Sequence, residues 1–223
     1  MGKKINTESI RSIDINEIFS MTYPNRDENS ICWFETAVLN CKTASTLLHN
    51  KIYCHALFFM QQCIECIVKG ILIENQIVNV REIKKWSHSP EEAFSAFYKV
   101  MESQYELFFA NIKERIIKEQ DLESKLEMTN SIINHYCQIY EDSLRKITTY
   151  NNPAILLKLC VDAIIISLSV LLNSMQQNTR YPDIETCKLP SVLYDESEIV
   201  VKHTPHILER IKYVLINVCP DIV

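Results

Sequence analysis

The chain has 223 residues and a formal net charge of −5, with 47% hydrophobic and 23% charged residues. This composition is that of an ordinary globular protein, and it argues against a protein that grips nucleic acid by overall positive charge alone. Only two glycines occur, one of them Gly2, so the glycine-rich phosphate-binding loops of P-loop and dinucleotide-binding proteins are excluded. A chain so poor in glycine favours long helices joined by simple loops.

Nine cysteines are scattered along the chain without the regular spacing of a disulfide framework. The N-terminal stretch MGKKINTESIRS has no apolar core and does not resemble a signal peptide. We therefore expect a reduced, cytoplasmic protein whose cysteines pack mostly as small hydrophobic side chains. Cys63 and Cys66 form a CxxC pair, but no second ligand pair at zinc-site spacing accompanies it, so we expect no metal site and no cofactor.

Hydrophobic periodicity divides the chain into a short arm and one helical domain. We assign residues 1–28 to an N-terminal arm and 29–223 to the domain. Apolar residues recur at spacings of three and four in the segments from about 30 to 49, 52 to 75, 90 to 118 and 122 to 147. Each of these segments is predicted to be a helix.

Three prolines that follow a capping residue indicate where helices begin, namely Ser89-Pro90, Asn152-Pro153 and Thr204-Pro205. Proline is tolerated at a first helical position because its missing N–H would be unpaired there anyway. No hydrophobic–polar alternation is long enough for a sheet. The sequence therefore predicts an all-α, up-and-down bundle of about five to six helices.

The most apolar stretch, residues 154–173, is interrupted by Lys158 and Asp162. Its uninterrupted run, 163–172, is too short to span a bilayer. We expect a buried central helix here and no association with a membrane.

The segment YCHALFFMQQCIECIVKG, residues 53–70, carries two different faces when it is placed on a helix. One face is apolar and contains Gly70, which would allow a neighbouring helix to approach closely. The other face contains Gln62, Glu65 and Lys69, with the carboxylate four residues before the ammonium, the favourable order for an ion pair. Two interpretations remain open: a partly solvated face with a surface ion pair, or a polar edge turned toward a ligand.

The motifs HALFFMQQCIECIVKGIL, SHSP and TRYPD occur in this order, and together they resemble the HEPN family (higher eukaryotes and prokaryotes nucleotide-binding). The resemblance covers roughly residues 30–183, and the last helix, from Thr204, is similar to the closing helix of that family. The helix predicted from about 122 to 147 resembles an insertion in this family, about 120–150. The matching residues are Ala56, Phe58, Phe59, Gln61, Gln62, Glu65, Lys69, His88, Arg180, Tyr181, Pro182 and Asp183.

The resemblance implies a small helical bundle that is often a homodimer and often encoded beside a minimal nucleotidyltransferase. Several branches of the family are metal-independent endoribonucleases. In these, an arginine is followed, after four to six intervening residues, by a histidine that takes a proton from the ribose 2′-hydroxyl while the arginine stabilises the phosphate charge. This chain departs from that pattern, because the window after Arg180 holds Glu185, Thr186 and Cys187. Arg81 and His88 have the right separation but lie in the loop after the second helix, and we attribute that match to chance.

The resemblance therefore favours the binding of a nucleotide or RNA, within a toxin–antitoxin or defence module that has a nucleotidyltransferase-type partner. Arg180 would hold a phosphate and Tyr181 would stack on a base, and Gln62, Glu65, Lys69, His88 and Asp183 would complete the binding residues. We expect no reading of DNA grooves.

Three alternatives remain open for these residues. In the first, Arg180 pairs with Asp183 or Glu65 and fixes a helix end. A second alternative is an endoribonuclease in which the long loop lets Arg180 meet His203 or His206. The third is an interaction module without a ligand.

Overall fold

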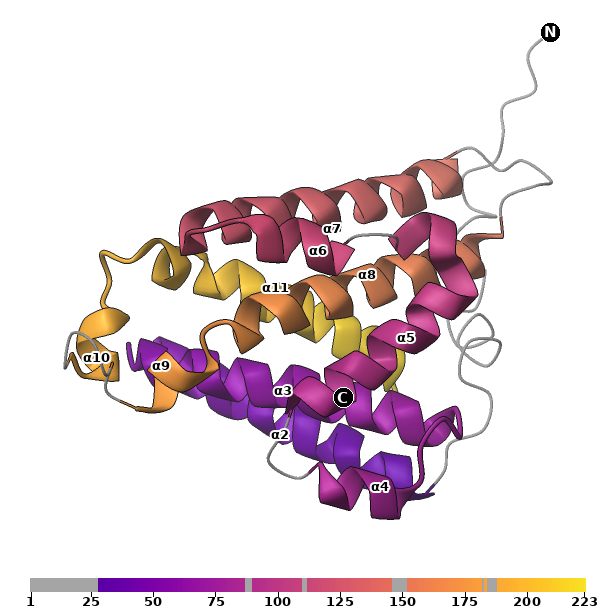
Figure 1. Ribbon diagram of the computed structural model, residues 1–223, viewed down its shortest axis with the longest axis horizontal. Helices are drawn as coiled ribbons and strands as arrows, with labels where there is room; N and C mark the ends of the chain where they lie inside the picture. The colour runs from indigo at the N-terminus through magenta and orange to yellow at the C-terminus, as the bar shows by residue number, and fades with distance from the viewer. Residues whose placement is uncertain (1–27, 87–89, 110–111, 146–151, 182, 184–187) are drawn as a thin grey trace, which may run out of the picture.

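The structure of the chain is a computed structural model. It describes residues 28–86, 90–109, 112–145, 152–181, 183 and 188–223. The described part contains ten helices and no strand, so the predicted all-α bundle is confirmed. Six helices have twenty residues or more, as expected from the periodicity, and four short ones connect them (Figure 1). The helices are α2 Glu28–His49, α3 Tyr53–Glu74, α4 Val80–Lys85, α5 Pro90–Phe109, α6 Ile112–Lys118, α7 Leu122–Arg145, α8 Pro153–Asn173, α9 Gln176–Arg180, α10 Pro190–Leu193 and α11 Ile199–Val218.

Helix α8 lies at the centre of the bundle and packs against α3, α5, α6, α7 and α11. It begins as the sequence predicts, because the Asn152 Oδ1 atom accepts a hydrogen bond from the backbone N–H of Ala154 at 3.0 Å and Pro153 takes the first helical position. In Figure 1 the α2–α3 hairpin covers one side of α8, and α6 and α7 cover the other.

Gly70 marks the closest approach within the α2–α3 hairpin, which confirms the role expected for it. A Cβ atom added at Gly70 would lie 2.6 Å from Cε1 of Phe34, a fully buried side chain of α2. The Phe34 ring therefore occupies the space that a side chain at position 70 would need.

Two sequence-based boundaries are wrong. The segment 90–118 is not one helix, because α5 ends at Phe109 and α6 begins at Ile112 in another direction (Figure 1). This turn lets Ile112 and Ile116 bury themselves where α6 packs on α7 and α8.

The last helix does not begin at Thr204-Pro205 either. Helix α11 starts six residues earlier, at Ile199, and Pro205 lies inside it. Proline at this position forgoes one intrahelical hydrogen bond. The buried Thr204 hydroxyl still donates to the Val200 carbonyl at 2.9 Å, so the first turns of α11 are held by both backbone and side chain.

Helices α3 and α8 are both long and apolar enough to cross a membrane by length and composition. For α8 this differs from the sequence argument, which counted only its uninterrupted apolar run. Most of each helix is buried within the fold, as in the core helices of many soluble proteins. The absence of a membrane association therefore stays a prediction.

Candidate functional site

Four polar residues of α3 form a hydrogen-bonded network in which Gln62 is half-buried and the other three are buried. Gln61, Glu65 and Lys69 expose only 2%, 5% and 2% of their surface. The Lys69 Nζ atom donates to Glu65 Oε1 at 2.7 Å. The other carboxylate oxygen, Glu65 Oε2, accepts from the Gln62 side chain at 3.1 Å and from Gln61 at 3.4 Å. The Gln62 amide also donates to Gln61 Oε1 at 2.6 Å, so both carboxylate oxygens and both amides are engaged.

Helix α2 adds one contact to this network. The Lys69 ammonium lies 5.0 Å from the centre of the Trp33 ring, which adds a cation–π contact to the ion pair. The interpretation of Glu65 and Lys69 as a surface ion pair on a solvated face is therefore wrong. The spacing correctly pairs the two residues, but packing of other helices on α3 removes them from water.

Arg180, at the end of α9, lies on the surface of α3. Its guanidinium carbon is 4.3 Å from the centre of the Phe58 ring, within cation–π distance. Phe58 precedes Gln62 by one helical turn, so α9 does pack against the segment to which the sequence motifs link it. The alternative ion pair between Arg180 and Glu65 is wrong, because the Glu65 carboxylate is held by Lys69 and the two glutamines.

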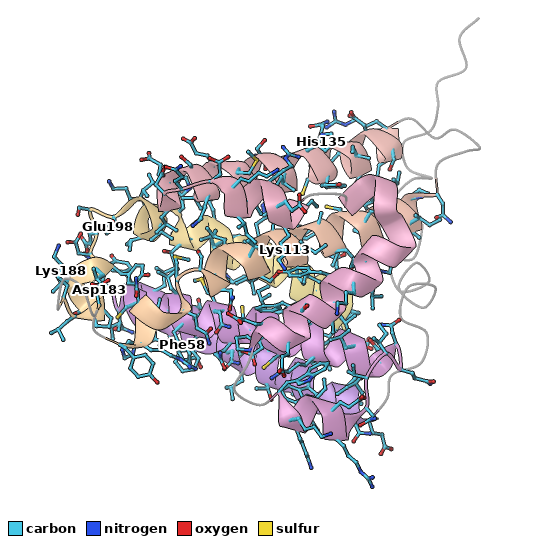
Figure 2. All side chains as sticks on the ribbon, in the orientation of Figure 1. Phe58, Lys113, His135, Asp183, Lys188 and Glu198 are labelled. Carbon is cyan, nitrogen blue, oxygen red and sulfur yellow. The ribbon has the colours of Figure 1, made fainter. Side chains whose placement is uncertain are left out.

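Tyr181 follows directly and is one of the most exposed large side chains of the described residues, with 63% of its surface accessible. Beyond it, the backbone N–H of Asp183 donates to the Lys188 carbonyl at 3.0 Å. Figure 2 places the labelled side chains of Asp183 and Lys188 at the same end of the molecule as Phe58. We call the surface formed by Phe58, Arg180, Tyr181 and Asp183 the α9 corner.

The candidate histidines are not brought to this corner within one chain. His203 and His206 lie on α11, with their ring centres 6.1 Å apart. Among the described residues, no hydrogen bond, ion pair or ring contact joins either of them to Arg180. His88, the remaining candidate, lies outside the described residues.

A cavity of about 500 Å³ between α5, α6, α7 and α8 was not foreseen from the sequence. Phe94 and Tyr98 line it with Lys113, which lies 5.0 Å from the Tyr98 ring centre, and with Lys125. These residues come from three helices, and no single-helix spacing could have brought them together. The two lysines, Lys113 exposed and Lys125 half-buried, make the cavity a competitor to the α9 corner for an anionic ligand.

Comparison with known proteins identifies one family. The family model described as HEPN domain matches residues 32–214, which is most of the chain. No curated protein and no solved structure matches the chain significantly.

Proposed function

Because the chain belongs to the HEPN domain family, a family of nucleotide- and RNA-related helical domains, we propose that it binds single-stranded RNA or a nucleotide at the α9 corner. The observation that carries the proposal is the Arg180 guanidinium lying over Phe58 beside the exposed ring of Tyr181. An arginine and an aromatic ring in this arrangement offer the two contacts that an unpaired nucleotide needs.

The Phe58 ring orients the guanidinium without consuming its hydrogen-bond donors. A guanidinium that lies on an aromatic face keeps its N–H groups free in its own plane, where they can bind two phosphate oxygens at once. The Tyr181 ring, with more than half of its surface in water, has a free face for a base. This contact is not base-specific, because every base presents a π-face.

The buried α3 network takes no direct part in the proposed site. Glu65 and Lys69 neutralise each other and are buried by the packing of other helices on α3, so a ligand at the α9 corner would not touch them. Their role in the proposal is to hold the α3 surface on which Phe58 and Arg180 lie.

Fluorescence anisotropy of a labelled single-stranded oligoribonucleotide tests the site. We expect Arg180→Ala and Tyr181→Ala each to weaken binding by about tenfold, the scale of one lost stacking or phosphate contact. Lys113→Ala and Lys125→Ala, in the cavity, serve as matched controls and should leave the affinity within about twofold. If only the cavity variants weaken binding, the α9 corner is not the site. Competition with unlabelled mononucleotide distinguishes a nucleotide site from one that requires a longer RNA.

The endoribonuclease alternative makes a different prediction in the same samples. In a homodimer, which also remains a prediction, His203 or His206 of one copy would have to meet Arg180 of the other for this chemistry. Cleavage of the oligoribonucleotide in the presence of a chelator, lost on both Arg180→Ala and His203→Ala, would support it. Intact RNA at saturating protein would leave binding as the function.

A nucleotidyltransferase-type protein partner is a second proposal, favoured by the surface next to the corner. Leu189, the N-cap residue of α10, and Val192 within this helix are both more than half exposed. Helix α10 packs directly against α9. Exposed apolar side chains on one short helix suit a protein contact. Such a partner should form a stable complex with the wild-type protein. Loss of this complex in Val192→Asp, with RNA binding unchanged, would show that the two surfaces are separate.

A further inference from the structure

Two cysteines from different helices meet beneath the surface of the bundle, away from the α9 corner. Cys137 of α7 and Cys160 of α8 have their sulfur atoms 3.4 Å apart, within hydrogen-bond distance for thiols. Cys160 is almost fully buried, whereas Cys137 is half-buried and therefore accessible from solvent. An accessible sulfur thus lies in contact with an inaccessible one.

Arg210 of α11 fixes the charge environment of the pair. Its Nη1 atom lies 3.5 Å from the Cys137 sulfur, and its Nη2 atom donates to Asn134 Oδ1 at 3.0 Å. Both partners lie on α7, so the guanidinium is held beside the sulfur by two contacts. Among the described residues no carboxylate forms an ion pair with Arg210, so its charge is not cancelled locally.

The other cysteines of the described residues lack this combination. Cys41 and Cys63 also form a thiol contact, between α2 and α3, but both are buried. Cys32 is exposed and has no neighbouring thiol among the contacts of the described residues. Among the described residues, only the Cys137–Cys160 pair combines a solvent-accessible sulfur, a second sulfur in contact with it and a neighbouring cation.

We propose that Cys137 and Cys160 form an oxidation site, in which a hydroperoxide converts the two thiols into a disulfide that links α7 to α8. In the first step the Cys137 thiolate attacks the peroxide. An S–O bond forms and the O–O bond breaks, which leaves Cys137 as a sulfenic acid and releases an alkoxide, or hydroxide from hydrogen peroxide, that takes up a proton.

In the second step the Cys160 sulfur attacks the sulfenic sulfur of Cys137. The S–S bond forms, the S–O bond breaks, and the departing hydroxide leaves as water with the proton of Cys160. Two thiol sulfurs are oxidised and one peroxide is reduced, so no further reactant is needed. The two sulfurs must approach each other by about 1.4 Å, since a disulfide bond is about 2.05 Å long.

The electrostatics favour Cys137 as the attacking group. The hydrogen bond from the Cys160 thiol, and the charge of Arg210, lower the pKa of Cys137 to about 7, against the opposing effects of burial and of Glu141 one turn along α7. The same hydrogen bond and burial raise the pKa of Cys160, which also faces Tyr213 of α11. One sulfur is thereby prepared to react first and the other to keep its proton until the second step.

The rate advantage can be stated as a fold-change. A thiol of pKa about 7 is about half ionised at pH 7, against roughly 1% for a thiol at the ordinary value of 9.0. Because a more acidic thiolate is a weaker nucleophile, the net gain is roughly fivefold. We therefore expect Cys137 to react with iodoacetamide at pH 7 about fivefold faster than a thiol with an ordinary pKa, and its rate to level off near pH 8.

Differential alkylation with peptide mass spectrometry tests the site in the full-length reduced protein. A slight excess of hydrogen peroxide should produce a Cys137–Cys160 disulfide before any other cysteine is modified. In Cys160→Ser the reaction should stop at a Cys137 sulfenic acid, which dimedone traps. In Arg210→Gln the reaction should slow several-fold. Cys41→Ser is the matched control and should leave the disulfide unchanged.

Two results would overturn the inference. One is oxidation that begins at Cys32 or at the buried Cys41–Cys63 pair. The other is a wild-type protein in which Cys137 reacts no faster than Cys32, together with an Arg210→Gln variant in which Cys137 reacts at the wild-type rate. Because the readout is the modified residue itself, the result does not depend on RNA binding.

Discussion

The two regions that the family motifs pick out differ in almost every physical respect. In the α3 network Gln61, Glu65 and Lys69 are buried and Gln62 is half-buried, with the two charges paired and both carboxylate oxygens accepting hydrogen bonds. The α9 corner carries an exposed cation on an aromatic ring and an exposed tyrosine. Buried, mutually satisfied polar groups specify a packing arrangement, whereas exposed ones are available to a ligand. The comparison assigns the first region to the fold and the second to function.

The largest expected effect comes from removing the charge of Glu65. Glu65→Gln keeps the shape of the side chain but leaves the Lys69 ammonium, which is 2% exposed, without its counter-charge. Because breaking a buried pair from one side leaves an uncompensated charge, we expect a loss of about 3–5 kcal/mol in the free energy of unfolding. Urea denaturation followed by circular dichroism measures it. A loss below about 1 kcal/mol would mean that the network is solvated.

A smaller loss is expected at the helix contact beside the network. In Gly70→Ala the new methyl group would overlap the Phe34 ring, at a cost of about 1–3 kcal/mol that the better helix propensity of alanine only partly offsets. The double variant with Phe34→Leu should recover part of the loss, since it vacates the overlapped space. Additive effects in this double-mutant cycle would contradict the close approach of α2 and α3.

At the α9 corner the effect on stability should be smaller still. Arg180→Ala removes a cation–π contact at an exposed position, which is worth less than about 1 kcal/mol. Its thermal unfolding midpoint should therefore stay close to that of wild type, in contrast with Glu65→Gln. A destabilisation equal to that of Glu65→Gln would place Arg180 in the fold rather than in the site.

The second lysine–carboxylate pair, in α8, sharpens the comparison because its carboxylate is buried but incompletely satisfied. Lys158 donates to Asp162 Oδ2 at 2.6 Å, while Asp162 Oδ1 accepts no hydrogen bond from a described residue. Burial raises the pKa of Asp162, and the Lys158 charge only partly opposes this. Since one-fifth of the Lys158 side chain is exposed, its ammonium can turn toward water. We therefore expect Asp162→Asn to change the stability at pH 7 by no more than about 1 kcal/mol, and in the stabilising direction.

The pH dependence of this variant follows from the direction of the shift. A carboxyl group with a raised pKa in the folded state binds more protons there than in the unfolded chain. Its contribution to stability is therefore complete below the ordinary aspartate pKa and declines as the pH rises through the folded value. The gain in Asp162→Asn should accordingly be larger at pH 7 than at pH 4. A gain that is larger at pH 4 would contradict the raised pKa.

Periodicity along the sequence predicted the contacts that form within one helix. The contacts between helices depend on packing and could not be predicted in this way. The pairing of Glu65 with Lys69 and the close approach at Gly70 follow from spacing along α3. The burial of that pair could not be predicted, because it results from the packing of other helices on α3. For the same reason the Cys137–Cys160 contact and the cavity between α5 and α8 were missed, since each combines residues from different helices. The start of α11 was misplaced because Pro205 is tolerated inside a helix that burial and Thr204 stabilise.

Photo-crosslinking of a single-stranded RNA that carries 4-thiouridine, followed by mass spectrometry of the linked peptides, tests the central claim most directly. The account predicts that the peptide containing Arg180 and Tyr181 carries the crosslink, and that Tyr181→Ala removes it while the protein stays folded. Crosslinks confined to peptides of α5, α6 and α7 around Lys113 and Lys125 would contradict it and assign the ligand to the cavity.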